Sequence, residues 1–274
     1  MTRRIGVAAT APFGADVFER LAAQHDVAFL LTRPDAPSGR GRKVAPPPAK
    51  LVAERLNVPV LQPERLTGDV AVQLCTATSP GVDAIVVAAY GLLIPDSLLE
   101  QTLWLNVHPS LLPRWRGAAP VERAIMAGDR ETGVTIHRTV KELDAGPIAA
   151  EGAFVIEDDD DAGAVFGRAA ELAADLLGGV LEQDEPRFDP QSEEGVTYAD
   201  KISAADRALD LADPEQAVRT VRALSPHIGA RATVDGREVT VWRARLEAGR
   251  FVPVEVQPAG KRRMTYDEFR RGLR

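Results

Sequence analysis

Short apolar runs, four to seven residues long, alternate with helical patterns along the first two thirds of the chain. Such alternation is typical of βαβ units, in which the strands of a parallel sheet are buried on both faces. We expect strands at residues 4–9, 27–31, 58–61, 83–89, 104–107, 134–139 and 148–156. The helices expected among them cover residues 15–23, 49–56 and 162–181. The strand at 134–139 alternates between polar and apolar residues, which predicts one solvent-exposed face.

The hydrophobic pattern changes beyond residue 183. Proline and acidic residues dominate 184–194, which is typical of a linker. A helix is then expected over 214–224, followed by short alternating strands at 230–235, 238–246 and 251–257, with Asp235 and Gly236 forming a turn. The chain is therefore predicted to hold an α/β domain over 1–183, a linker over 184–204 and a small antiparallel β domain over 205–274.

Composition limits the class of protein. The one cysteine, Cys75, excludes a disulfide framework and a cysteine-based zinc site, and it fits a reducing compartment. No apolar run approaches the roughly 18 to 20 residues of a membrane span, and the first residues lack the pattern of a signal peptide. The four histidines show no ligand spacing, so no metal is expected. We therefore expect a cytoplasmic protein with no membrane contact.

The net charge of −7 conceals a marked separation of charge along the chain. Residues 151–195 carry 14 acidic and 2 basic side chains, whereas residues 216–274 carry 13 basic and 6 acidic ones. A second basic segment, residues 33–50, carries five basic side chains and one acidic one. Basic segments on an acidic protein fit an anionic partner such as a nucleic acid, but they fit solvated surfaces equally well.

Three polar residues form a candidate catalytic set. Asn106 and His108 stand two apart at the end of a predicted strand, so their side chains point the same way. Asp144 lies in a segment of small residues, Asp-Ala-Gly-Pro. An amide, an imidazole and a carboxylate are the groups that acyl transfer needs, because they can stabilise an oxyanion and move an amine proton. Taken singly, each could equally be an ordinary cap or turn residue.

Several motifs resemble the methionyl-tRNA formyltransferase family, within the formyltransferases that use 10-formyltetrahydrofolate. The most specific is the fifteen-residue block 106–120, NVHPSLLPRWRGAAP. The other matching segments are 32–43, 88–92, 131–136, 143–147, 197–202 and 255–264, which span nearly the whole chain in order. The resemblance implies a Rossmann-like formyltransferase domain with a mostly parallel sheet, followed by an OB-like β domain. It also implies a monomer acting on initiator methionyl-tRNA.

The resemblance also implies roles for individual residues. Asn106 would hydrogen-bond the formyl oxygen, His108 would transfer protons, and Asp144 would orient and charge His108. The residues that would line the folate pocket are Ala89, Tyr90, Gly91, Ser110, Leu111, Leu112 and Pro113. Those that would contact tRNA are Arg40, Arg42 and Lys43.

The sequence departs from the family pattern in two places. The first strand ends in Ala9-Thr-Ala-Pro12 where the family has Gly-Thr-Pro. Only eight residues separate Arg245 from Val254, a gap in which the family has further strands. About three strands cannot close a five-stranded barrel, so the second domain is expected to be reduced. This reduction leaves open a formyltransferase that acts on an amino sugar nucleotide. A non-catalytic protein that binds folate or tRNA is a second, separate alternative.

Overall fold

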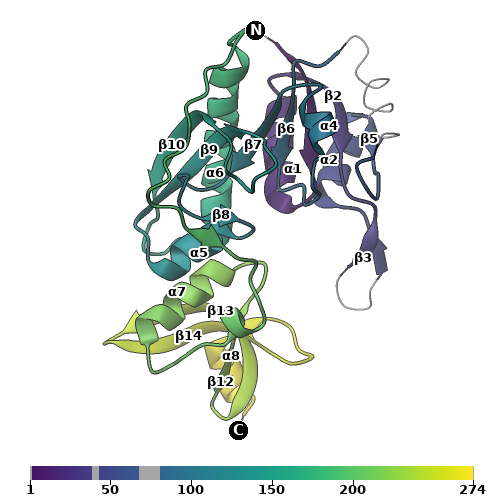
Figure 1. Ribbon diagram of the computed structural model, residues 1–274. Helices are drawn as coiled ribbons and strands as arrows, with labels where there is room; N and C mark the ends of the chain where they lie inside the picture. The colour runs from purple at the N-terminus through teal and green to yellow at the C-terminus, as the bar shows by residue number, and fades with distance from the viewer. Residues whose placement is uncertain (1, 39–42, 68–80, 274) are drawn as a thin grey trace. The chain divides into compact units, whose positions relative to one another are not determined.

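The computed structural model describes residues 2–38, 43–67 and 81–273 (Figure 1). The chain divides into two compact units, each built from three separate segments. Unit 1 comprises Met1–Arg116, Gly133–Ala153 and Gly167–Val196. Unit 2 comprises Gly117–Thr132, Phe154–Phe166 and Thr197–Arg274.

A seven-stranded, mostly parallel sheet forms the centre of unit 1, in the order β10-β9-β7-β6-β1-β2-β5 (Figure 1). Its strands are β1 (Arg4–Ala9), β2 (Asp26–Leu31), β5 (Val60–Leu61), β6 (Ala84–Ala88), β7 (Trp104–His108), β9 (Glu131–Arg138) and β10 (Ile148–Val155). The pairs β1–β2, β1–β6, β2–β5 and β6–β7 are parallel, and β9 is antiparallel to β7. The carboxyl ends of β1, β2, β6 and β7 therefore meet at one edge, where open α/β sheets bind ligands.

Helices cover the sheet through small and aliphatic side chains. They are α1 (Pro12–Ala22), α2 (Pro48–Leu56), the short α4 (Asp96–Leu99) and α6 (Ala162–Leu181). Helix α1 buries Val17, Phe18 and Leu21, which recur at helical spacing. Gly14 lets it approach the end of β6, since a Cβ there would collide with the carbonyl oxygen of Ala88. The first turn of α1 is thereby packed against the ligand-binding edge.

The predicted strands and helices of unit 1 are confirmed, with three corrections. Strand β9 does not have the predicted exposed face, because its six central residues, 132–137, are all buried and the side chains on both of its faces are covered. Helix α1 begins at Pro12, three residues before the predicted start, because proline is well tolerated in a first helical turn. The basic segment 33–50, for which no strand is predicted, contains a short antiparallel pair, β3 (Ala36–Ser38) and β4 (Lys43–Ala45).

Unit 2 holds a four-stranded antiparallel sheet in the order β12-β13-β14-β15. The strands are β12 (Ala230–Val234), β13 (Arg237–Glu247), β14 (Arg250–Pro258) and β15 (Met264–Thr265). The helical elements are α5 (Pro120–Ala127), η1 (Ala205–Arg207), α7 (Pro214–Leu224) and α8 (Tyr266–Arg271). Strand β8 (Arg116–Gly117) pairs with β11 (Tyr198–Ala199). Helix α7 packs on β13, and α8 on β14.

The expected small antiparallel β domain is present, with one strand more than the three predicted. Two-residue turns with positive φ join its long strands: Asp235 and Gly236 (φ 48° and 74°), then Ala248 and Gly249 (φ 49° and 71°). Such turns match the twist of paired strands, so the short gap seen in the sequence is simply a tight hairpin. Pairing is described only between successive strands, so the described sheet is open. The outer edge of β12 receives the N–H of Leu209, which donates to the carbonyl of Arg231 (2.9 Å).

Candidate active site

The predicted catalytic residues converge at the carboxyl end of β7. The Nδ2 group of Asn106 donates to Oδ1 of Asp144 (3.2 Å). Nδ1 of His108 lies 3.6 Å from Oδ2 of the same carboxylate. Asn106 and His108 therefore do point the same way from β7, as their spacing predicts, and one carboxylate contacts both. The side chains of His108 and Asp144 are only 5% and 12% exposed, so this interaction is largely removed from water.

His137 is a fourth member of this cluster, and it is not part of the candidate set that the sequence analysis identifies. It lies on β9 opposite Asn106 and is buried. Its Nδ1 lies 3.0 Å from the carbonyl oxygen of Arg138, and its Nε2 lies 3.0 Å from Nδ2 of Asn106. The sequence places His137 in a predicted strand, but only the antiparallel pairing of β9 with β7 shows that its partner is Asn106.

Unusual backbone conformations hold the groups around His108. Asp144 (φ 47°) and Trp115 (φ 65°) both adopt the left-handed region, which non-glycine residues rarely occupy. Such strain persists only where the surroundings enforce it, and it gathers at functional sites. The segment carrying Asp144 also approaches β9 closely, since a Cβ at Gly146 would collide with the carbonyl oxygen of Arg138. The path of the backbone therefore requires glycine at position 146.

Both nitrogens of His108 face acceptors. Nε2 lies 2.8 Å from the carbonyl oxygen of Trp115, which can only accept, so Nε2 carries a proton. Nδ1 faces the Asp144 carboxylate, and a proton there would also be held. Burial lowers the pKa of His108, while the carboxylate of Asp144 and the Trp115 carbonyl oppose that shift. Because the net effect lowers the pKa of His108, the neutral ring is favoured, and an imidazolium formed there releases its proton readily while Asp144 and the Trp115 carbonyl reduce its cost.

The amide group of Asn106 has a defined orientation. Because Nδ1 of His137 donates to a carbonyl, Nε2 of a neutral His137 is an acceptor, and it takes one N–H of Asn106. The other N–H serves Asp144. Exchanging the amide nitrogen and oxygen would set the oxygen against a carboxylate, so this orientation is fixed by the network. Donation to a substrate therefore requires one of these hydrogen bonds to be replaced.

The predicted folate residues lie on two segments that follow neighbouring strands. Residues 110–113 follow β7, where Ser110 donates to the carbonyl of Arg114 (2.7 Å) and Leu112 is buried. Buried Thr135 fixes this turn, because its hydroxyl donates to the carbonyl of Ser110 (2.7 Å) and accepts from the N–H of Leu112 (3.1 Å). Leu111 and Pro113 are half-buried. The sequence offered no sign of the role of Thr135.

Residues 89–91 follow β6. Ala89 (φ 46°) and Gly91 (φ 81°) are exposed and left-handed, whereas Tyr90 is buried in the hydrophobic cluster around Phe29 and Trp104. Burial raises the pKa of Tyr90, whose hydroxyl has no hydrogen-bond partner among the described residues. This segment therefore offers a ligand its backbone rather than the tyrosine ring.

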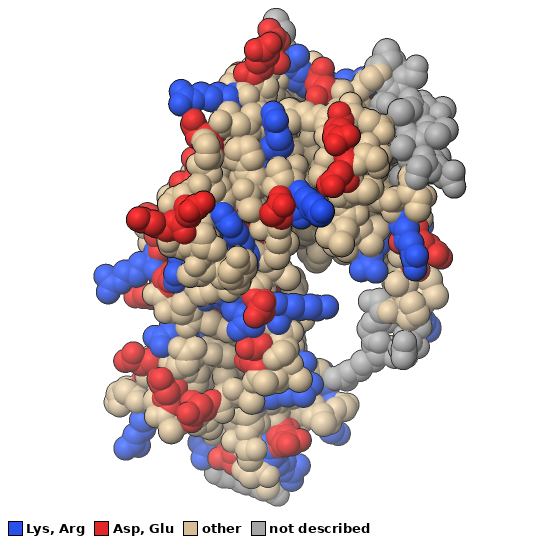
Figure 2. Space-filling model, viewed as in Figure 1, with Lys and Arg blue, Asp and Glu red and all other residues tan. Residues whose placement is uncertain are grey.

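The predicted tRNA residues are only partly described. Lys43 is exposed at the start of β4, and Arg40 and Arg42 lie outside the described residues. Figure 2 shows basic and acidic side chains interspersed on the face in view, so neither sign forms a continuous patch there. Charge on this face therefore does not by itself mark an interface.

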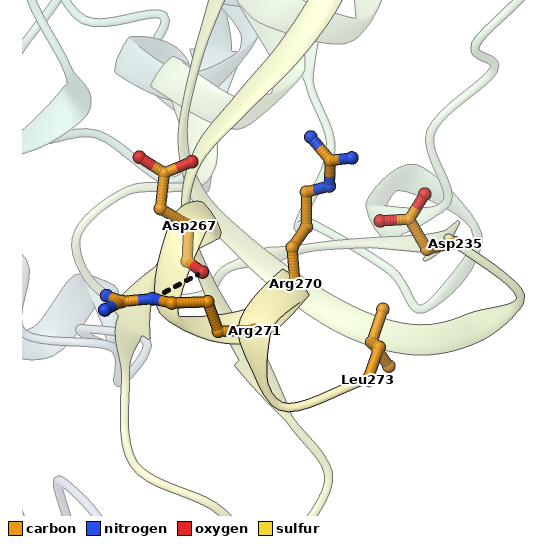
Figure 3. A pocket seen from close by; sticks show the side chains of 5 residues that line it. All are labelled: Asp235, Asp267, Arg270, Arg271 and Leu273. Atoms are coloured by element: carbon orange, nitrogen blue, oxygen red, sulfur yellow. Dashed lines mark hydrogen bonds between the residues drawn. The ribbon is translucent and has the colours of Figure 1, made fainter.

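A cavity of about 510 Å³ lies in unit 2 (Figure 3). Its lining residues are Asp235, Asp267, Arg270, Arg271 and Leu273. Two acidic and two basic side chains offset each other there, and none of the predicted site residues lines it. Among the described residues, no group of three potential ligands could hold a metal ion. No helix in the described part of the chain is long and apolar enough to cross a membrane.

Comparison with known proteins matches residues 4–181 to the formyl transferase family model. Two relatives named methionyl-tRNA formyltransferase come from Paracoccus denitrificans and Halorhodospira halophila. The first is 39% identical over 96% of this chain and 95% of its own length. The second is 43% identical over 91% of this chain and 82% of its own length. These likenesses extend over both units.

Solved structures share the fold at low identity. A HypX variant from Aquifex aeolicus has a TM-score of 0.70 at 17% identity, covering 99% of this chain and 47% of that one. A methionyl-tRNA formyltransferase from Clostridium thermocellum gives 0.64 at 16% identity, covering 93% and 98%. A likely sugar N-formyltransferase from Mycobacterium tuberculosis gives 0.62 at 22%, covering 90% and 98%. The fold thus leaves the acceptor open, while the sequence relatives decide the family: this chain belongs to the methionyl-tRNA formyltransferases.

Proposed function

We propose that this enzyme transfers the formyl group of 10-formyltetrahydrofolate to the α-amine of methionyl initiator tRNA. The observation that carries the chemistry is the cluster of Asn106, His108 and Asp144 at the carboxyl end of β7. Methionyl-tRNA formyltransferases related along almost the whole chain support the choice of acceptor. The buried surroundings suit acyl transfer, because hydrogen bonds and charges act more strongly where water is excluded.

In this proposal Nδ2 of Asn106 exchanges one of its present hydrogen bonds for one to the formyl oxygen. The amine nitrogen forms a bond to the formyl carbon, and negative charge gathers on that oxygen as the carbonyl bond opens. A positioned amide donor of this kind contributes roughly 10²–10³ in rate. His108 accepts at Nδ1 the proton that the amine loses, because Nε2 is already protonated toward the Trp115 carbonyl, and Nδ1 returns one to the folate nitrogen as the bond from that nitrogen to carbon breaks. Such proton transfer contributes roughly 10²–10⁴.

Asp144 assists in two ways. Its carboxylate holds the imidazole ring against rotation and opposes the lowering of the His108 pKa caused by burial. His108 can therefore take a proton during the reaction although it is buried. Asp144 itself stays ionised in this scheme, as the orienting carboxylate does in other His–carboxylate pairs.

The residues at the sheet edge fit a folate donor. Ala89 and Gly91 expose left-handed backbone beside the cluster's strand, and the turn at 110–113 is held rigid by Thr135. The bound donor supplies the one-carbon unit already activated on nitrogen. The chain's part is to orient it, so rigid backbone is more useful here than mobile side chains.

The acceptor is tested by supplying labelled 10-formyltetrahydrofolate with charged initiator tRNA, charged elongator methionyl-tRNA or a 4-amino sugar nucleotide. We expect incorporation of label into initiator tRNA. His108→Ala should lower turnover at least about a hundredfold. The control His227→Ala, which changes an exposed histidine, should leave turnover unchanged. Preferential labelling of the sugar nucleotide would overturn the proposal. Donor binding without any transfer would indicate a non-catalytic binding protein.

A further inference from the structure

Gln191 contacts the backbone of the loop 143–147, which carries Asp144. Gln191 lies 47 residues beyond Asp144 in the chain. Its Nε2 donates to the carbonyl oxygens of Asp144 (2.8 Å) and Gly146 (2.7 Å). Its Oε1 accepts two hydrogen bonds from Arg116, at 3.1 Å from Nε and 2.6 Å from Nη2. Both donors and the acceptor of one side-chain amide are thus used.

Backbone pairing fixes the segment that carries Gln191. Ile148 and Asp189 form an isolated antiparallel bridge, with both of their N–H groups donating across it at 2.7 and 2.9 Å. Gln191 follows two residues later, so its side chain is presented to the loop from an anchored backbone. It supports two carbonyls in the segment where Asp144 is held in a left-handed conformation.

The partner of Gln191 completes the connection to His108. Arg116 directly follows Trp115, whose carbonyl accepts the Nε2 proton of His108. Gln191 holds the backbone of Asp144, whose carboxylate faces Nδ1 of His108. The Arg116–Gln191 pair therefore joins the two segments that provide the acceptors on either side of one imidazole ring.

We propose that Gln191, oriented by Arg116, is a positioning residue that keeps the carboxylate of Asp144 and the carbonyl of Trp115 in register on His108. This inference rests on the proposed function for its kinetic readout. It assigns Arg116, which belongs to the block 106–120 that resembles the methionyl-tRNA formyltransferase family, to the support of the loop 143–147. A misplacement of about 1 Å at a reacting group can lower the rate about a hundredfold, so a contact that holds Asp144 in place can affect kcat strongly.

The test compares Gln191→Leu and Gln191→Glu with the neighbouring control Ser192→Ala. Leucine keeps the size of the side chain, and glutamate keeps an acceptor for Arg116, but neither donates to the two carbonyls. We expect kcat to fall at least about tenfold in both variants with little change in the KM of either substrate. Ser192→Ala should match the unmodified enzyme in both constants.

A second readout follows the titration of His108 by NMR in the full-length protein without substrates. The titratable groups facing this ring are Asp144 and His137, beside the Trp115 carbonyl. Displacement of Asp144 removes a favourable charge, so the His108 midpoint should move to lower pH in Gln191→Leu, which adds no charge of its own. Arg116→Met should produce the same shift, with no further loss in the Arg116→Met, Gln191→Leu double variant.

Variants that fold, keep kcat and titrate like the unmodified protein would overturn the inference. A raised KM for tRNA with kcat intact would also overturn it, by assigning the pair to substrate binding. If leucine prevents folding, the glutamate variant provides the decisive comparison. Because the titration needs no substrate, failure of the proposed function would leave this positioning test fully interpretable.

Discussion

At the scale of single residues, the chemistry depends on His108, whose neighbours have opposite effects on its pKa. Burial favours neutral His108, whereas Asp144 and the carbonyl of Trp115 favour its charged form. Folding lowers the pKa of His108 below its ordinary value, so protonation of this residue lowers the free energy of unfolding. The full free energy of unfolding is therefore present above the ordinary pKa of about 6.5. It declines as pH falls from there toward the lowered value.

Asp144→Asn should change both the rate and its pH dependence. The neutral amide no longer offsets burial, so the pKa of His108 falls further and the acid limb of kcat/KM moves to lower pH. The plateau should drop by about a hundredfold or more, because the imidazole loses its orienting charge. A pH–rate profile checks both effects. An acid limb that stays in place or moves upward would show that Asp144 does not act on His108 as proposed.

At the scale of secondary-structure elements, the reversal of direction between β7 and β9 completes the active site. Because β9 is antiparallel to β7, His137 lies opposite Asn106, and Thr135 lies opposite His108. One strand therefore orients the catalytic amide and also fixes the turn predicted to contact folate. In unit 2, helix α8 contributes Phe269 to the hydrophobic cluster of the open sheet.

Phe269→Ala should selectively destabilise unit 2. Phe269 is 4% exposed and packs with Val221, Leu224 and Val256, so its loss leaves a cavity costing about 3–5 kcal/mol. Hydrogen exchange should become faster at the amides of β13 and β14, while the sheet of unit 1 remains protected. Arg271→Ala, an exposed change in the same helix, serves as the control. Unchanged exchange in β13 and β14 would mean that α8 contributes little to the open sheet.

At the scale of the whole molecule, an acidic protein must bind a polyanion through local basic segments. Net charge opposes tRNA, with 40 acidic residues against 33 Lys and Arg. The described part of the basic segment 33–50 includes exposed Lys43, while Lys50 is paired with Asp35 at 2.9 Å. Binding should therefore depend on a limited number of phosphate contacts.

The affinity for tRNA should fall linearly with salt on logarithmic axes, while folate affinity changes far less. Each lost phosphate contact reduces the magnitude of that slope by about one, so Lys43→Ala should flatten it by this amount. Arg20→Ala, on α1 and outside the basic segment, provides the control. Binding titrations at several salt concentrations measure the slopes. Equal slopes for the Lys43 variant and the unmodified protein would remove this residue from the tRNA interface.

The parallel sheet, the long helix α6 and a small antiparallel β domain could be predicted from the amino-acid sequence, as could the candidate set of Asn106, His108 and Asp144. Each followed from local information: hydrophobic period, turn residues, and specific motifs beside predicted strand ends. The roles of His137, Thr135 and Gln191 emerge only from the folded chain. Their side chains act on segments 23 to 75 residues away, through strand pairing and loop contacts that no local pattern encodes. The burial of a side chain likewise depends on which segments pack against it. Strand β9 is therefore buried on both faces although its polar and apolar residues alternate.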